Sequence, residues 1–400
     1  MRRLDLIVFG ATSFVGQIIC RVLLEAGEVK WAMAGRSETK LREVRTGLGD
    51  AAKDIELLVA DAADQPALKA MCLQTKVVIS TVGPYALYGS PLVEVCATTG
   101  TDCCDLTGEA QWVRQMIERH EAAAKASGAR IVHCCGFDSL PSDLGVHFLQ
   151  RAAIERFGQP LERFKTRVKA VRGAVSGGTY ASLMNLVEEA STNSAVRREL
   201  ADPYSLCPAG ADRSKVRQPS LNATGYDADF KAFTAPFVMA AINSRIVHRS
   251  NALSGHRYGS EFRYDEAMLM GRGVRGRVRS LGLTAGLGVF MGAAAVPSVR
   301  WALSRFVLPK PGEGPSPDAQ ARGFWDFRLF GKTADGKSLR AKVTGDRDPG
   351  YGSTAKMVVQ AGLALAETKS AGGFWTPATV MGDALIERLV KHAGVTFELA

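Results

Sequence analysis

The sequence has few of the residue spacings that hold metal ions. Its eight cysteines include the adjacent pairs Cys103-Cys104 and Cys134-Cys135 but no CxxC pair. Its six histidines form no HExxH or similar pair of ligands. We therefore predict no metal site, and we expect the cysteines to be thiols in the core rather than a disulfide framework.

Signals for nucleic-acid binding and for secretion are also missing. There is no zinc-finger spacing and no basic helix with interleaved aromatic residues, so nucleic acid is not an expected partner. The amino terminus does not have a charged region followed by a longer apolar stretch and a cleavage site, which is the pattern of a signal peptide, so we expect a cytoplasmic protein. The net charge of +10 favours anionic partners, namely a phosphorylated cofactor, an acidic acyl carrier or an anionic membrane surface.

The length and composition indicate a globular protein of two domains. A chain of 400 residues is too long for one ordinary core, and 46% hydrophobic with 22% charged residues is typical of globular proteins. We predict a dinucleotide-binding domain over residues 1–150. An α+β domain for substrate or dimerisation would cover 151–345, and a helix after about residue 350 would pack back on the first domain.

The strongest motif lies at the amino terminus. The apolar run Leu4–Phe9 predicts a buried parallel strand, and it leads directly into a glycine turn and an apolar pattern with helical spacing. This layout is typical of a dinucleotide-binding βα unit, although an ordinary glycine turn is the alternative. Ser13 stands where the middle glycine often lies. The predicted pyrophosphate site consists of Gly10, Ala11, Thr12, Ser13, Phe14, Val15 and Gly16.

The end of the second predicted strand distinguishes between cofactors. The strand Trp31–Ala34 is followed by Gly35, Arg36 and Ser37. Enzymes that use NAD usually carry an acidic residue here, whereas a guanidinium can bind a 2′-phosphate. We therefore predict NADP, with Ser37 and Lys40 adding to the pocket. A surface arginine in a loop is the alternative.

Loops after the third and fourth predicted strands supply further candidates. Asp61 follows the strand Ile55–Ala60, where it could contact the adenine or simply end the strand. The loop after Val77–Thr81 would lie beside the nicotinamide at the carboxyl edge of the sheet. Four residues at this edge are assigned to the cofactor site: Thr81, Val82, Gly83 and Pro84.

Two tyrosines in the same loop are the predicted catalytic residues. A phenol from Tyr85 or Tyr88 could donate a proton or hold the substrate, although aromatic residues in such loops often only pack. Tyr351 is a further candidate phenol if the late helix closes the cleft. Asp138, after the sixth strand, could contact the substrate, while Ser142 or Asp143 is expected to cap the next helix.

The repeated alternation of strand and helix predicts an α/β fold, a Rossmann doubly wound parallel sheet with a second α+β domain. After about residue 150, Gly177, Gly178 and Thr179 could bind a substrate carboxylate or carbonyl, or they could form a capped turn. The cluster Arg245, His248 and Arg249 is interpreted as a solvated face, with a role near an anionic carrier as the alternative.

Several motifs together resemble the saccharopine dehydrogenase-like oxidoreductases, and within them the trans-acting enoyl reductases. These motifs are GATSFVG, AGRSETKL, STVGPYALYG, DLTGE, CGFDSLPSD, PKPGEGPS (Pro309–Ser316) and GDRDPGYGSTAKM (Gly345–Met357). The resemblance covers nearly the whole chain. It implies a Rossmann domain, a nicotinamide cofactor and a second α+β domain. The enoyl reductase branch further implies a lipid-like enoyl thioester and partnership with a polyketide synthase.

One uncharged stretch stands apart from these motifs. Residues 280–299 lack charge, contain Gly282, Gly286, Gly288 and Gly292, and lie between clusters of arginine. Three interpretations stay open. It could be a buried or homodimer-interface helix, the wall of a substrate tunnel or a membrane-surface patch, or a true span.

We expect an NADP-dependent oxidoreductase that reduces the C=C bond of a lipid or polyketide thioester. Its partners would be a hydrophobic acyl substrate and an acyl carrier or polyketide synthase, and it could lie peripherally at a membrane. The alternatives are an amino-acid dehydrogenase acting on a C–N bond and a non-catalytic NADP-binding protein at a lipid surface.

Overall fold

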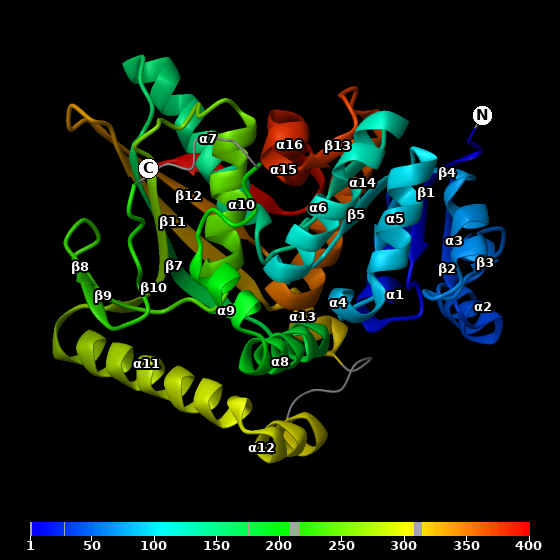
Figure 1. Ribbon diagram of the computed structural model, residues 1–400, viewed down its shortest axis with the longest axis horizontal. Helices are drawn as coiled ribbons and strands as arrows, with labels where there is room; N and C mark the ends of the chain where they lie inside the picture. The colour runs from blue at the N-terminus through cyan, green and yellow to red at the C-terminus, as the bar shows by residue number, and fades with distance from the viewer. Residues whose placement is uncertain (1, 28, 175, 209–215, 308–313) are drawn as a thin grey trace.

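The computed structural model contains two seven-stranded β-sheets with helices on and between them (Figure 1). It describes residues 2–27, 29–174, 176–208, 216–307 and 314–400. Residues 309–313 of the motif Pro309–Ser316 lie outside the described residues. The predicted fold class, a Rossmann doubly wound sheet with a second α+β unit, is confirmed.

The first sheet is parallel throughout, in the order β13-β6-β5-β4-β1-β2-β3. Its strands are β1 Leu4–Phe9, β2 Trp31–Gly35, β3 Glu56–Val59, β4 Thr75–Ser80, β5 Asp102–Asp105, β6 Arg130–Val132 and β13 Gly373–Trp375. The helices that accompany it are α1 Phe14–Glu25, α2 Glu38–Gly47, α3 Gln65–Cys72, α4 Tyr85–Tyr88, α5 Ser90–Thr99 and α6 Ala110–Ser127. A single turn of 3-10 helix covers Asp50–Ala52.

Polar caps begin several of these helices. The side chains of Ser13, Ser37 and Asp64 each accept a hydrogen bond from a backbone N–H three residues on. These bonds satisfy donors that the first helical turn leaves without an intrahelical partner. The strands β1, β2 and β3 are each followed by a short turn and a helix. Because these three strands are parallel neighbours, their carboxyl ends lie at one edge of the sheet.

The second sheet is mixed, in the order β14-β12-β11-β7-β10-β9-β8. Its strands are β7 Arg163–Arg172, β8 Gly225–Asp227, β9 Ala232–Ala235, β10 Arg263–Gly271, β11 Phe324–Lys332, β12 Ser338–Gly345 and β14 Val395–Leu399. β7 and β10 are parallel, and the other neighbouring strands are antiparallel. The strands β11 and β12 form a hairpin around Asp335 and Gly336.

Helices between the two sheets give them one continuous core. They are α7 Leu140–Phe157, α10 Ala240–Leu253, α14 Thr354–Glu367, α15 Pro377–Val380 and α16 Gly382–His392. α14 packs on β1, β4 and β5, α7 packs on β11 and β12, and α16 contacts both helices. A single hydrophobic cluster therefore includes Leu6 and Val8 of the first sheet together with Phe164 and Trp325 of the second.

The other helices lie toward the lower edge of Figure 1. They are α8 Gly177–Thr192, α9 Ser194–Ala201, α11 Gly273–Ala295, α12 Pro297–Ala302 and α13 Pro317–Ala321, with π-helical turns at Leu303–Val307 and Pro349–Ser353. α11 runs along that edge, and within the described residues it is the one helix long and apolar enough to cross a membrane. Only 11% of the most apolar stretch of this helix is buried, so the interpretation of residues 280–299 as a buried helix is wrong.

The predicted cap of α7 is also wrong. The helix begins after Ser139, and both candidate residues are buried inside its first turns. The Asp143 carboxylate accepts from the Ser250 hydroxyl at 2.5 Å and from the Ala378 N–H at 2.8 Å. The Ser142 hydroxyl accepts from the side-chain amide of Asn243. These side chains therefore join α7 to α10 and α15.

The interpretation of the basic cluster on α10 as a solvated face is wrong as well. Arg245, His248 and Arg249 are each no more than 4% exposed. The Arg249 guanidinium donates to the carbonyl oxygens of Leu206 and Phe374. Burial lowers the pKa of His248 to about 3, so this imidazole is neutral. The cluster therefore belongs to the interior.

Because one core serves both sheets, we expect a substitution in the second sheet to destabilise the whole chain. Leu329 on β11 is 1% exposed, so Leu329→Ala should lower the free energy of unfolding by about 2–5 kcal/mol. Urea unfolding followed by both circular dichroism and tryptophan fluorescence measures this change. The control Leu73→Ala, at a side chain 53% exposed, should cost less than about 0.5 kcal/mol. Two separate transitions would contradict the shared core.

Candidate functional site

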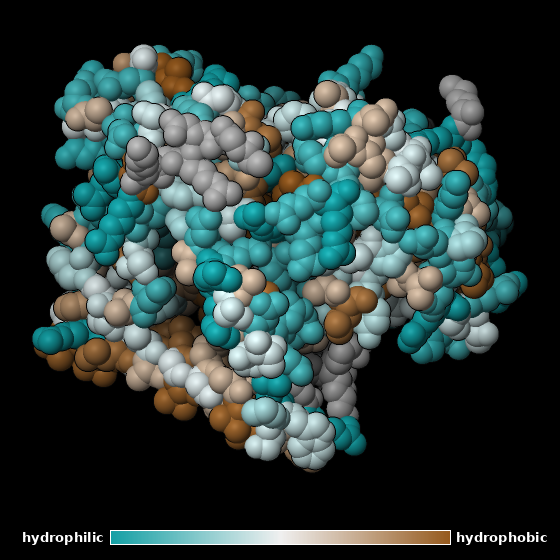
Figure 2. Space-filling view, in the orientation of Figure 1, coloured by the Kyte–Doolittle hydropathy of each residue, from teal (hydrophilic) through white to brown (hydrophobic). Residues whose placement is uncertain are grey.

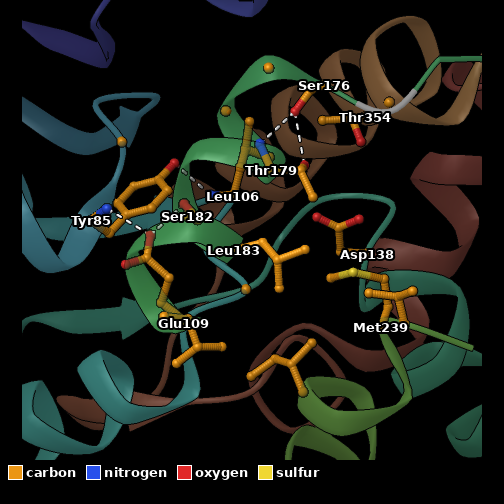
Figure 3. Close-up of a pocket in the computed structure, with 18 of the residues that line it drawn as sticks. Tyr85, Leu106, Glu109, Asp138, Ser176, Thr179, Ser182, Leu183, Met239 and Thr354 are labelled. Atoms are coloured by element: carbon orange, nitrogen blue, oxygen red, sulfur yellow. Dashed lines mark hydrogen bonds between the residues drawn. The ribbon is translucent and has the colours of Figure 1, made fainter. Parts of the chain in front are cut away.

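A cavity of about 260 Å³ lies at the carboxyl edge of the first sheet. The glycine turn after β1 and the loop after β4 line one side, and α8, α9 and α10 line the other. Open α/β sheets bind ligands at this edge, where the strand order reverses. Here the order reverses between β1 and β4. The cavity is therefore the candidate site (Figure 3).

The glycine turn is packed too closely for larger residues. Gly10 has a φ of 89°, and a Cβ there would lie 2.5 Å from the Thr81 hydroxyl oxygen. A Cβ on Gly16 would lie 2.2 Å from the Gly10 carbonyl oxygen. The Thr81 hydroxyl donates to that carbonyl at 3.0 Å. β1, α1 and the loop after β4 therefore meet without room for a side chain.

The turn also leaves backbone donors available for an anion. The Ser13 hydroxyl accepts from the Gly16 N–H at 3.0 Å, and it lies 3.0 Å from the Thr81 hydroxyl. The N–H groups of Phe14 and Val15 donate to no described residue. They lie in the first turn of α1, where free donors and the helix dipole favour negative charge. The turn thus fits the pyrophosphate of a dinucleotide.

The residues at the end of β2 lie at the same edge. Arg36 is exposed, and its guanidinium makes no hydrogen bond or ion pair with any residue that the structure describes. Gly35 ends the strand, and the Ser37 hydroxyl caps α2 by accepting from the Lys40 N–H. After β3, the Asp61 carboxylate accepts from the Ala63 N–H at 2.9 Å. Asp61 therefore forms a local turn, while Arg36 keeps its donors.

The predicted tyrosines have different surroundings. The Tyr85 hydroxyl donates to the Ser80 carbonyl at 3.0 Å and accepts from the Leu106 N–H at 3.2 Å. Burial and the nearby Asp105 carboxylate raise the pKa of Tyr85 well above its usual range. Tyr88 is 49% exposed and does not line the cavity. A catalytic role for either residue stays a prediction.

Glu109 is a cavity residue that sequence reasoning missed. Its carboxylate accepts from the N–H groups of Tyr85 and Ala86 at 2.8 and 2.9 Å, and from the Ser182 hydroxyl at 2.7 Å. It therefore caps α4 and ties that loop to α8 (Figure 3). Only the motif DLTGE, which ends at this residue, pointed to the position.

Asp138 presents a carboxyl group to the cavity without a hydrogen-bond partner among the described residues. Figure 3 shows it facing the same open space as Leu183. Its removal from water raises the pKa of Asp138 to about 6. The preceding backbone is fixed because the Phe137 N–H donates to the Thr354 hydroxyl at 3.0 Å. The loop after β6 thus holds a carboxyl that can gain or lose a proton near neutral pH.

The far wall of the cavity is mainly apolar. Its side chains come from α8, α9, α10 and the residues just before α10: Leu183, Leu186, Leu200, Val238, Met239 and Ile242. Arg245 also reaches this wall, but its guanidinium donates to the Ser205 hydroxyl and to the carbonyls of Ala241 and Leu200. These bonds direct its donors away from a ligand.

Tyr351 connects the two sides of the cavity. Its ring packs edge-on against Phe14 of the glycine turn, with centroids 5.0 Å apart. Its hydroxyl accepts from the Gly177 N–H at the start of α8 at 3.2 Å. Ser176 caps α8 by accepting from the Thr179 N–H at 3.0 Å. A capped turn, which is one of the two alternatives predicted for residues 177–179, therefore lies beside the cavity.

Comparison with known proteins gives the family. No family model matches the chain. A trans-acting enoyl reductase from Mycobacterium tuberculosis is 38% identical over 409 residues, which cover 98% of this chain and 97% of that protein. One from Mycobacterium leprae is 39% identical over 411 residues, with the same coverage of both chains. The chain belongs to the trans-acting enoyl reductase family.

The fold of this family member is also that of a solved dehydrogenase. Saccharopine dehydrogenase from Saccharomyces cerevisiae superposes with a TM-score of 0.56 at 12% identity, covering 99% of both chains. Within the enoyl reductase family fold, the motifs GATSFVG, STVGPYALYG, CGFDSLPSD and GDRDPGYGSTAKM all contribute residues to the cavity. Segments that are far apart in the chain therefore meet at one site.

The cavity carboxyl should make stability depend on pH. The folded pKa of Asp138 is about 6, above its ordinary value of 3.8. The unfolded chain therefore loses this proton first as pH rises, and the folded protein loses stability between pH 4 and 6. Asp138→Asn should remove this loss, raising the free energy of unfolding by about 1–3 kcal/mol at pH 8 and leaving it unchanged near pH 4.

Urea unfolding at a series of pH values measures this difference. The control is Asp54→Asn, at an exposed carboxyl, which should change the midpoint little at any pH. An equal effect of Asp138→Asn at pH 4 and pH 8 would show that packing, not charge, determines it.

Proposed function

We propose that this protein is an NADPH-dependent enoyl reductase that saturates the C=C bond of a lipid or polyketide thioester presented by a polyketide synthase. The observation that carries this proposal is the composition of the cavity. It combines backbone donors at a glycine turn and a carboxyl group, neither of which is paired with a described residue, with a mainly apolar wall. The names of the full-length relatives support the same activity.

The glycine turn would hold the coenzyme. The N–H groups of Phe14 and Val15 would bind its pyrophosphate, and the unpaired guanidinium of Arg36 would bind the 2′-phosphate that distinguishes NADP from NAD. When bound, the reduced coenzyme supplies a hydride for the β-carbon of the enoyl thioester. Thr81 and Gly83 line the cavity beside this turn.

The walls favour an acyl chain over a charged amino acid. Leu183, Leu186 and Met239 offer apolar surface to a hydrocarbon chain. A saccharopine-like substrate carries several carboxylates and would need cations to pair with them. Arg245 is the one cation lining the cavity among the described residues, and its donors are already bonded to protein oxygens.

Asp138 would complete the reduction as the proton donor. Its carboxyl oxygen holds a proton in the water-poor cavity and gives it to the α-carbon, which becomes negative as the β-carbon is reduced. The product is the saturated thioester. Tyr85 is the alternative donor, but its hydroxyl proton is directed to the Ser80 carbonyl.

Substitution of Arg36 tests the coenzyme. Arg36→Asp should weaken NADPH binding by about 10- to 100-fold because one charge-assisted pair with the 2′-phosphate is lost. Titration followed by nicotinamide fluorescence measures this, with NADH as the comparison. The control Arg21→Asp, at an exposed arginine of α1, should leave both affinities unchanged. Preference of the unmodified protein for NADH would remove NADP from the proposal.

Substitution of Asp138 tests the chemistry. With enoyl-CoA as a surrogate substrate, Asp138→Asn should lower kcat by about 10²- to 10⁴-fold while NADPH still binds. The activity of the unmodified protein should fall as pH rises above about 6, and the activity of the variant should not show this fall. Tyr85→Phe is the matched variant and should keep most of the activity. Consumption of saccharopine instead of the enoyl thioester would favour the C–N dehydrogenase.

A further inference from the structure

One face of α11 is held by the protein and the opposite face is left in water. The inner face packs at both ends of the helix. Near its start, the Ser280 hydroxyl donates to the Thr234 carbonyl of β9 at 2.5 Å. Near its end, buried Ala294 contacts Met184 and Val187 of α8. The helix therefore lies flat along the body.

The outer face is apolar and continues into the next two elements. Val289 of α11 is 73% exposed, and Phe306 of the following turn is 74% exposed. Other large apolar side chains exposed along this edge are Val274, Val278, Leu281, Met291, Val296, Val299 and Trp301. Figure 2 shows the α11 part of this band as brown atoms along the lower left edge of the molecule. We call this surface, formed by residues 274–306, the α11 face.

The charges around the α11 face have one sign. No acidic residue occurs between Arg272 and Val307. Four exposed arginines at its start make no ion pair with any described residue: Arg272, Arg275, Arg277 and Arg279. Arg305 is exposed at the other end, while Arg300 pairs with Glu188 of α8 at 3.6 Å. An apolar band bordered by unpaired arginines thus faces outward.

We propose that the α11 face docks on an anionic lipid surface, with α11 lying in the plane of the headgroups. Interfacial helices combine exposed apolar residues with basic residues that pair with acidic lipids. A spanning helix would need its ends on opposite sides of the bilayer, but both ends of α11 pack on one folded body.

A second copy of the chain fits the α11 face less well than lipid. Two α11 helices paired in parallel would bring the four unpaired arginines of each copy together. Paired antiparallel, they would bring those arginines to the end that carries Arg305. Neither arrangement supplies an acidic partner from this surface, so like charges would repel. Anionic headgroups neutralise them instead.

The docked helix would lie one helix away from the cavity. α8 uses Leu183 and Leu186 to line the cavity, and its Met184 and Val187 face α11. This step rests on the proposed function. An acyl chain dissolved in the membrane would then approach the enzyme from the side on which the apolar wall of the cavity lies. The docking itself does not depend on that function.

Flotation with vesicles tests the docking. The full chain should float with vesicles of phosphatidylglycerol and phosphatidylcholine at low salt, and much less with phosphatidylcholine alone. Val278→Asp combined with Val289→Asp should lower the bound fraction at least about 10-fold, because two charges enter the apolar band. The control Val390→Asp, at a valine 50% exposed on α16, should bind as the unmodified protein does.

The arginines are tested in the same assay. The triple variant Arg275→Glu, Arg277→Glu, Arg279→Glu should bind anionic vesicles at least about 10-fold less, whereas Arg119→Glu on α6 should bind normally. Trp301 supplies a local readout, since its emission should shift to the blue on docking and Trp301→Phe should remove that shift.

Three results would overturn the docking proposal. They are no flotation of the unmodified protein at low salt, equal flotation of the double aspartate variant, or a dimer in solution that the double aspartate variant dissociates. The last result would assign the α11 face to a second copy. NADPH affinity is measured on every variant, so loss of flotation with normal NADPH binding separates the docking from the proposed function and from misfolding.

Discussion

The buried carboxylate of Asp348 is the interaction on which the cavity depends. It is 1% exposed and accepts from the Ala174 N–H at 2.7 Å and from the Tyr351 N–H at 2.8 Å. It thereby joins the segment that follows β7 of the second sheet to the turn that begins α14. Because α14 packs on the first sheet, this side chain joins the two walls of the cavity, together with the contacts of Tyr351 and Glu109.

The cavity has a polar side and an apolar side because the first sheet forms one wall and the helices α8, α9 and α10 form the other. The first sheet contributes the carboxyl ends of its strands, where backbone donors and short polar side chains collect. The helices α8, α9 and α10 contribute aliphatic side chains. Asp138 lies where the two sides meet. A carboxyl that faces an apolar wall without a partner keeps its proton to higher pH, which is the property that proton donation near neutral pH requires.

The two sides of this site differ in how well sequence could predict them. The strand, glycine turn and capped helix at the amino terminus are local features, so Gly10, Ser13 and Gly16 could be assigned from their spacing. Glu109 could not, because its partners Tyr85 and Ser182 come from other segments. Arg245 was misplaced on a solvated face, since the Ser205 hydroxyl and the Leu200 carbonyl that accept from its guanidinium lie outside α10. The edge strand β13 was missed because it has three residues and depends on pairing with β6.

The sequence by itself determined the alternating strands and helices, the glycine turn after β1 and the family, because each of these can be recognised from residues close together in the chain. Only the tertiary structure decided that the apolar face of α11 stays in water while the charged side chains of α10 are buried. Hydropathy is similar for a helix inside a core and for one at a lipid surface. Which of its faces meets protein depends on contacts between distant segments.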